Sequence, residues 1–322
     1  RAKFKANKSC ANGTVKSSLS QFQTNLKKLS DPSLLQTVKA SSSDTTAVNV
    51  SASSTASPGN YAVQIRQLAQ TQKLVADGQT DMTSSIGTGL VSFEFGTISG
   101  GSKSSGQYNN ASFQGNGLGI KTVNIDQAHS SLSGIRDAIN AAGIGVTASI
   151  INDGSTTPYR LTLTNTQTGE TQSMKISVSG NSGSLSDLIS QDPAGTQNMT
   201  ETVAAQNAKL SVDGINISKP TNTLTDVIPG VTLNLLNTTL TSAYNYNQNS
   251  DSDNSGGDNS NNSSTSSVAN TIQVTIARDS QALSANIQTF TDSYNKLVSS
   301  LKTMTTYDQA SHTGAVLYGE SS

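Results

Sequence analysis

The stretch QALSANIQTFTDSYNKLVSSLKTMTTY, residues 281–307, contains the strongest structural signal of the sequence. Its apolar residues recur at alternating steps of four and three: Leu283, Ile287, Phe290, Tyr294, Leu297, Leu301 and Met304. That spacing places them along one face of an α-helix, and no Gly or Pro interrupts it. A face this narrow is not buried by its own helix, so the pattern predicts a partner helix.

The partner is expected near the other end of the chain. There the same steps of four and three connect Val15, Leu19, Phe22, Leu26 and Leu29. Gly13 is expected to mark the start of this helix, and Pro32 to end it and to open a short helix through Leu34 and Leu35. We call the two apolar rows the stem seam. The hypothesis is a helical stem built from both chain ends; the alternative is two unrelated surface helices on a larger core.

Between these two helices the hydrophobic period changes from about 3.6 to two, which is typical of half-buried strands. Alternating segments occur at residues 48–50, 61–65, 93–95, 123–125, 146–151, 161–163, 174–178, 210–212, 215–217, 231–235 and 272–276. Asp213-Gly214, between two of them, predicts a hairpin with a type I′ turn. The fold class predicted is therefore α+β: a helical stem that carries inserted antiparallel β-rich head domains.

Short helices are expected within the head. Leu132 to Ala142 has one apolar face, Ser130 or Ser131 as N-cap and Gly143 at the C-terminal capping position. Another short helix is predicted at residues 185–189, and a helical turn at 224–228. Residues 241–270 are rich in Asn, Ser, Asp and Gly and are predicted to form a disordered loop, because they have too little to bury.

The composition excludes several classes of function. The net charge of −1 gives no electrostatic basis for binding nucleic acid or an anionic membrane. No segment approaches the length of a membrane span, so membrane insertion is not expected. Cys10 is the one cysteine and cannot form an internal disulfide. The sequence begins with Arg1 and ends abruptly, so we expect it to be a piece of a longer protein.

Candidate chemical sites are weak. Asp251 to Gly256 begins like a calcium loop, but Asn262 occupies the position that requires a bidentate Glu. His129 and His312 both lie in polar, turn-like sequence and lack neighbouring metal ligands. We therefore predict no catalytic residue, no cofactor-binding residue and no metal site, and we do not expect an enzyme.

Several stretches together resemble the bacterial flagellar filament cap family, also called the hook-associated protein 2 family. They are GTVKSSLSQFQ at 13–23, YAVQI at 61–65 with LAQ at 68–70, VDG at 212–214, DVIPGVTL at 226–233, and Phe290 with YNKL at 294–297. Residues 132–150, which include the pair Ile139-Asn140, are similar to a motif of flagellin-type head domains. The ordered combination is more specific than any single motif.

The resemblance implies a structural role. Proteins of this family form a ring at the growing tip of the flagellar filament, beneath which exported flagellin folds and inserts. The implied partners are further copies of the chain, flagellin, the flagellar export apparatus and an export chaperone; a host surface is a further candidate. The implied location is the extracellular tip of the flagellum, reached by the flagellar type III route without a cleaved signal peptide. Compared with the family pattern, we expect the terminal helical arms to be missing from this piece of sequence.

Three domains are expected. The stem comprises residues 1–41 and 279–322, the first head domain 42–80 and 206–278, and the second head domain, with the Ile-Asn motif, 81–205. The alternative function is a stalked surface adhesin with a β-rich binding head. The two hypotheses differ in the stem, because a cap needs a second helical face for its neighbours, whereas an adhesin stalk needs only its own seam.

Overall fold

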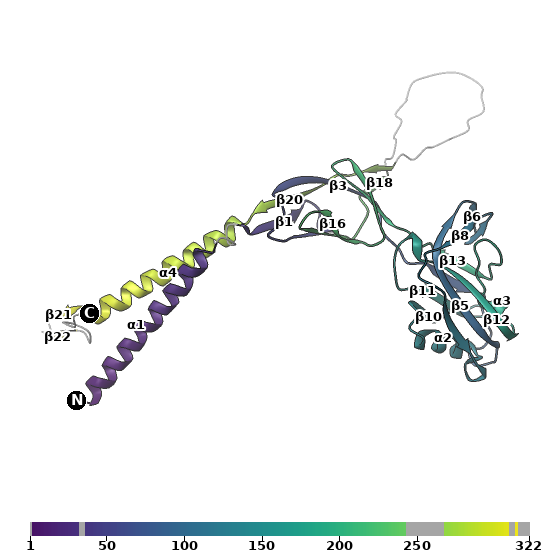
Figure 1. Cartoon of the computed structure of the whole chain (residues 1–322), viewed down its shortest axis with the longest axis horizontal. Coiled ribbons are helices and arrows are strands. Elements are labelled where there is room, and N and C mark those ends of the chain that lie inside the picture. The colour runs from purple at the N-terminus through teal and green to yellow at the C-terminus, as the bar shows by residue number, and fades with distance from the viewer. Residues whose placement is uncertain (1, 32–35, 243–266, 309–312, 315–322) are drawn as a thin grey trace, which may run out of the picture.

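The computed structural model describes residues 2–31, 36–242, 267–308 and 313–314. The molecule is elongated, with a helical stem at one end and two successive β regions beyond it (Figure 1). The stem consists of α1 (Ala2–Leu29) and α4 (Ser280–Thr305), which run antiparallel and contact each other. The described fold is thus of the predicted α+β class.

The helix α1 is longer at its start than expected, because it passes through Gly13 instead of beginning after it. A glycine inside a helix costs only about 1 kcal/mol, which the flanking helix-forming residues offset. The helix α4 begins just after Asp279, its N-cap, whose carboxylate accepts a hydrogen bond of 2.9 Å from the Ala282 amide. Beyond it, β21 (Tyr307–Asp308) pairs with β22 (Thr313–Gly314).

The proximal β region, next to the stem, combines two antiparallel sheets over one apolar core. The larger sheet has the order β1 (Val38–Ser42), β20 (Ile272–Arg278), β3 (Gly59–Gln67), β14 (Ala208–Val212) and β15 (Ile215–Lys219). The smaller has the order β16 (Thr223–Ile228), β17 (Val231–Leu235) and β2 (Val48–Ala52). A short pair, β18 (Leu240–Ser242) and β19 (Ser267–Ala269), adjoins them.

The distal β region, residues 72–203, has its own apolar core. One sheet has the order β10 (Val146–Asn152), β11 (Tyr159–Asn165), β4 (Lys73–Ala76) and β13 (Met199–Val203). In the other, β5 (Gly87–Ser99) pairs with β12 (Ser173–Gly183), β8 (Ser112–Gly115) and β9 (Lys121–Ile125). A hairpin of β6 (Ser102–Ser104) and β7 (Gln107–Asn109) and the helical elements η2 (Gln127–His129), α2 (Leu132–Ala141), η3 (Glu170–Gln172) and α3 (Leu185–Ile189) complete it.

Several local predictions are confirmed. The helix α2 has Ser131 as its N-cap, and Gly143 adopts a positive φ of 58° just after it. Asp213 and Gly214, with φ of 49° and 82°, form the turn of the β14–β15 hairpin. The predicted strands correspond to strands of the structure, and α3 covers residues 185–189.

Three expectations need correction. Residues 224–228 belong to the strand β16 and not to a helical turn, because Leu224 pairs with Leu233 of β17. The strand β1 begins at Val38, inside the range assigned to the stem, and pairs with β20. The strand β4 lies in the range assigned to the first head domain, yet it pairs with β11 and β13 of the distal region, so that boundary lies near Gln72.

The Ile-Asn motif connects the helix α2 to the distal core and to the edge strand β10. Ile139 is buried in the distal core, and Asn140 turns toward β10, the edge strand of its sheet. Its side-chain amide donates a hydrogen bond of 2.9 Å to the Ala148 carbonyl and accepts one of 2.8 Å from the Ala148 amide. The asparagine thereby takes the place of a neighbouring strand at this point of the sheet edge.

Other predictions lie outside the described residues: the short helix through Leu34 and Leu35, most of the 241–270 loop with the calcium-like segment at its centre, and His312. Among the helices of the described ranges, none is long and apolar enough to span a membrane.

Candidate functional site: the helical stem

The two stem helices are joined at mid-length by aromatic side chains. The ring of Phe22 on α1 lies 5.3 Å from that of Phe290 and 6.1 Å from that of Tyr294 on α4, measured between centroids, with both pairs tilted. Such tilted arrangements are favourable for aromatic pairs. The stem seam therefore brings residues from opposite ends of the chain into contact.

Small polar residues also lie buried between the two helices. Ser18, Asn25 and Ser293 are buried, although they are not part of the stem seam. Ser18 Oγ lies 3.4 Å from Ser300 Oγ, and Asn25 Nδ2 donates to the Thr289 carbonyl at 3.5 Å. The row of α1 that contains Ser18 and Asn25 therefore faces α4 most directly, and the apolar row beside it is turned partly toward the surface.

The rotation leaves part of the stem seam uncovered. Val15, Phe22, Leu29, Leu283, Phe290, Leu297 and Met304 are half-buried. The other five have exposed fractions between 41% and 51%: Leu19, Leu26, Ile287, Tyr294 and Leu301. We call these five residues the apolar stem face. The pair of helices does not enclose its own seam, contrary to the sequence-based expectation of a mutual burial.

The apolar stem face lies on one side of the pair. Four of these five residues follow a contact residue by one position: Leu19 after Ser18, Leu26 after Asn25, Tyr294 after Ser293 and Leu301 after Ser300. One residue corresponds to about 100° around the helix axis. Because α1 and α4 are antiparallel, rotation in the same sense brings both rows to the same side.

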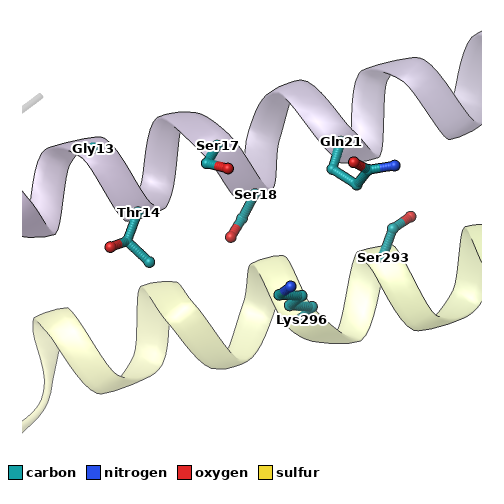
Figure 2. Close-up of a pocket in the computed structure, with 7 residues that line it drawn as sticks. All are labelled: Gly13, Thr14, Ser17, Ser18, Gln21, Ser293 and Lys296. Atoms are coloured by element: carbon teal, nitrogen blue, oxygen red, sulfur yellow. The ribbon is translucent and has the colours of Figure 1, made fainter.

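The opposite side of the stem is polar. A groove of about 510 Å³ between the helices is lined by Gly13, Thr14, Ser17, Ser18, Gln21, Ser293 and Lys296 (Figure 2). In Figure 2 the side chains of Thr14, Ser18 and Gln21 on α1 and of Ser293 on α4 extend toward the space between the two helices. Ser17 and Gln21 lie on the far side of the contact axis from Leu19. The stem thus has one apolar and one polar side, which is the pattern of a helical layer that packs against something further.

The candidate chemical residues are not brought together into a site. In the part of the chain that the structure describes, no group of three or more His, Cys, Asp and Glu residues could hold a metal ion. His129 lies at the surface, where its Nδ1 is 2.8 Å from the Asp126 carboxylate. That hydrogen bond lowers the pKa of the Asp126 carboxyl. Asp126 is also the N-cap of η2, so the His129–Asp126 pair is explained by the local turn and does not indicate a catalytic site.

The sequence reasoning missed the residues that set the helix contact. Ser18 and Asn25 are seven positions apart, which is two helical turns, and they lie one position before two seam leucines. Their spacing is a sequence signal, but small polar residues are also common on exposed helix faces, so the spacing alone does not indicate a helix contact. It also missed Glu201, a buried carboxylate of the distal β region whose partners are distant in sequence.

Family models match most of the chain. The model described as flagellar hook-associated protein 2 N-terminus matches residues 3–72, and the one described as its C-terminus matches residues 205–322. Between them, a model of the flagellin hook IN motif matches residues 112–167, which contain Asn140 and its partner strand.

Individual relatives agree. Flagellar hook-associated protein 2 of Escherichia coli (strain K12) is 38% identical over 216 residues, or 67% of this chain and 42% of the relative. The B-type flagellar hook-associated protein 2 of Pseudomonas aeruginosa is 28% identical over 325 residues, or 95% of this chain and 58% of the relative. The chain therefore spans about half the length of these curated relatives.

A solved structure extends the likeness to the fold. The crystal structure of the flagellar cap protein FliD D1-D2-D3 domains from Escherichia coli matches with a TM-score of 0.64 at 31% identity, covering 94% of this chain and 71% of that one. These matches give no support to the adhesin alternative. The stem, both β regions and the Ile-Asn motif are all covered by these matches, and the chain belongs to the flagellar hook-associated protein 2 family.

Proposed function

We propose that the protein is a structural cap at the distal end of the bacterial flagellar filament. Copies of the chain form a ring there, and the ring promotes folding and insertion of exported flagellin. The proposal is supported by family membership and by the description of the similar Escherichia coli structure as a flagellar cap protein. The role is mechanical, and the protein acts outside the cell at the flagellum tip.

The observation that carries the proposal is the apolar stem face. Large apolar side chains that gather on one side of a two-helix layer mark an interaction surface. Leu26 and Leu301, from opposite ends of the chain, are 45% and 41% exposed. The face is the second helical surface that a cap needs and that a free stalk lacks. Its partners are a neighbouring copy of the chain and flagellin.

The three-domain organisation belongs to the same proposal, with its boundaries adjusted. The stem carries assembly, and the two β regions form separate head domains that project from it. Two separate apolar cores support this division. Delivery by the flagellar type III route, with an export chaperone, follows from the family resemblance and is checked by immunoblotting culture supernatants of export-deficient and chaperone-deficient strains.

The proposal is tested in a strain that secretes flagellin and lacks its cap protein. The strain receives the full-length protein either unchanged or with Leu26→Asp and Leu301→Asp. Because both leucines are exposed, the substitutions add charge to the apolar stem face without placing a carboxylate in a core. Unchanged protein restores filaments, whereas the double variant is exported, leaves the strain without filaments, and releases flagellin monomers into the medium.

A matched control places the same charges on the polar side. Ser17→Asp with Gln21→Asp also adds two carboxylates to the stem, but beside the polar groove, and restores filaments as the unchanged protein does. Circular dichroism shows the same helical content for all three proteins. Normal filaments from the Leu26→Asp, Leu301→Asp strain would exclude the apolar stem face as the assembly surface.

A further inference from the structure

The two β regions meet where the chain crosses between them twice. The outward crossing, residues 68–72, leaves β3 for β4, and the return crossing, 204–207, leaves β13 for β14. The crossings are bonded to each other: the Gln70 amide donates to the Gln206 carbonyl at 2.9 Å, and the Gln206 amide donates back to Gln70 at 3.2 Å. The Gln206 side chain also donates to the Leu68 carbonyl at 3.0 Å. The joint is therefore a two-stranded connection.

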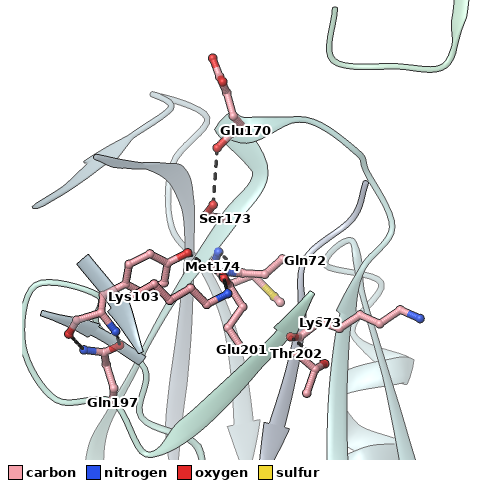
Figure 3. Close-up of polar contacts among 10 residues, drawn as sticks. Gln72, Lys73, Lys103, Glu170, Ser173, Met174, Gln197, Glu201 and Thr202 are labelled. Atoms are coloured by element: carbon pink, nitrogen blue, oxygen red, sulfur yellow. Dashed lines mark hydrogen bonds and ion pairs between the residues drawn. The ribbon is translucent and has the colours of Figure 1, made fainter. Parts of the chain in front are cut away.

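A buried carboxylate lies beside this joint. Glu201 on β13 is the one charged side chain that is buried among the described residues. Lys103 Nζ donates to Glu201 Oε1, and Gln72 Nε2 donates to Oε2 (Figure 3). The Tyr108 hydroxyl also donates to Oε1, at 2.7 Å. All the donors come from parts of the chain distant in sequence. A carboxylate out of water requires such partners, and loss of one is costly.

One of these donors belongs to the joint itself. Gln72 ends the outward crossing and is 1% exposed. While its Nε2 donates to Glu201, its Oε1 accepts a hydrogen bond of 2.6 Å from the Met174 amide of β12. Its backbone carbonyl accepts a third, of 3.1 Å, from the Asn165 amide of β11. Gln72 is thus attached to three different strands of the distal β region, and Glu201 holds one of the attachments.

The other two donors belong to the β6–β7 hairpin, which we call the strap. The strap is held mainly by polar contacts, since Ser102, Lys103 and Ser104 are exposed. The Glu201 amide donates to the Gly106 carbonyl at 2.9 Å. Gln197 accepts from the Tyr108 amide and donates to the Tyr108 carbonyl, both at 2.7 Å. Glu201 and Gln197 therefore fasten the strap over β13.

We propose that Glu201 is a conformational lock which couples the strap to the joint between the two β regions. With the strap closed, Glu201 has its full set of donors and keeps Gln72 in place, so the β regions hold one mutual orientation. With the strap open, Glu201 loses Lys103 and Tyr108, water reaches the carboxylate, and Gln72 loses its fixed partner. The closed strap and the rigid joint form together as one cooperative state. This inference does not depend on whether the protein caps a filament.

The test measures strap opening and joint movement in the same protein. Spin labels are placed at Ser51→Cys on β2 and Ser149→Cys on β10, both exposed strand positions, in a Cys10→Ser background. Pulsed electron resonance gives the distribution of distances between the labels, and amide hydrogen exchange reports on residues 68–72 and 102–109. The lock is weakened by Lys103→Met, by the milder Tyr108→Phe and by Glu201→Gln.

A matched control is available in the same region. Lys175 pairs with Asp192 at 2.9 Å, and its side chain is 33% exposed, the same as that of Lys103. Lys175→Met therefore removes the ion pair of an equally exposed lysine, with a carboxylate that is 30% exposed and not buried, and this pair touches neither the strap nor the joint. Its label distances and amide exchange match those of the unsubstituted protein.

In Lys103→Met we expect exchange in both segments to become faster by on the order of tenfold, equivalent to about 1.4 kcal/mol, and the distance distribution to broaden. Tyr108→Phe has a smaller effect in the same direction. Faster exchange in the strap with an unchanged distance distribution overturns the coupling, and unchanged exchange in Lys103→Met overturns the lock. Lys103 and Tyr108 lie partly at the surface, so we expect their variants to fold. These variants therefore test the coupling between strap and joint even if Glu201→Gln fails to fold.

Discussion

The ring of Phe22 on α1 lies 5.3 Å from the ring of Phe290 on α4, and this pair joins the two ends of the chain. We expect Phe22→Ala and Phe290→Ala to be non-additive, because each removes the other's partner. A coupling free energy of about 0.5–1.5 kcal/mol is expected from urea unfolding of the single and double variants. Simple additivity would mean that the helices of the stem are not packed as described. Phe22→Ala with Met304→Ala, which lies near the other end of α4, serves as the additive control.

The two hydrogen bonds between the Asn140 side chain and the Ala148 backbone give a second prediction. Asn140→Ala leaves the amide and the carbonyl of Ala148 without their side-chain partners at the edge of the sheet. A loss of about 1–3 kcal/mol in unfolding free energy of the distal β region is expected. Asn124→Ala, an exposed asparagine on β9, is the control and should change little. Equal melting temperatures for the two variants would show that the Asn140–Ala148 hydrogen bonds do not stabilise the distal β region.

The turn of the β14–β15 hairpin gives a third prediction. Gly214 has a φ of 82°, and a Cβ built there meets nothing within 4 Å, so backbone strain alone opposes a side chain. Gly214→Val should cost about 1–3 kcal/mol, because a β-branched residue resists this conformation. Gly214→Asn should cost less, since asparagine tolerates it better. Limited proteolysis of the valine variant should cut the proximal β region first; an equal effect of both substitutions would argue against strain as the cause.

Tyr108 predicts how the distal β region responds to alkali. Burial, reinforced by the hydrogen bond to Glu201 and by its charge, raises the pKa of the Tyr108 phenol above its ordinary value of 10.0. The folded protein therefore holds this proton more tightly than the unfolded chain does. The resulting stability is fully present below about pH 10 and is lost as the pH rises through the folded pKa.

This contribution is measured by urea unfolding at a series of pH values from about 9 upward. Above about pH 10 the unfolding free energy of the unsubstituted protein should fall more steeply than that of Tyr108→Phe, which has no phenol to ionise. Tyr159→Phe, a half-buried tyrosine of β11, controls for the loss of a hydroxyl. Parallel slopes for all three proteins would show that Tyr108 ionises freely in the folded state.

The sequence predicted those features that depend on local periodicity. The alternation of steps in residues 283–304 identified α4, and Asp213-Gly214 identified the hairpin, because both signals are complete within a few residues. Predictions from local sequence were wrong where a segment's structure depends on a strand that pairs with it. Residues 224–228 form a strand since β17 offers its edge, which no local propensity records. Gly13 does not end α1, because a helix accommodates a single glycine at a cost of about 1 kcal/mol.

The candidate site shows the same limit. Periodicity identified the seam residues but not the direction from which α4 contacts α1, which Ser18, Asn25 and Ser293 set. Glu201 could not be predicted at all: Gln72 lies 129 positions away and Lys103 98 positions away, so no window of sequence contains the network. Such a buried charge appears in sequence as one more polar residue on a short strand.

The order in which the chain connects its parts has a consequence for how the protein folds. The distal β region is one unbroken segment, the proximal sheet joins Val63 to Ile272, and the stem joins Ser18 to Ser300 across 282 positions. These pairings are nested, so closing the innermost shortens the loop that the next must close and lowers its entropic cost. We expect the molecule to form from its far end toward its termini, with the helices last. If the chain emerges with its N-terminus first, α1 stays unpaired until α4 has also emerged. The apolar stem face then forms only after both β regions are complete.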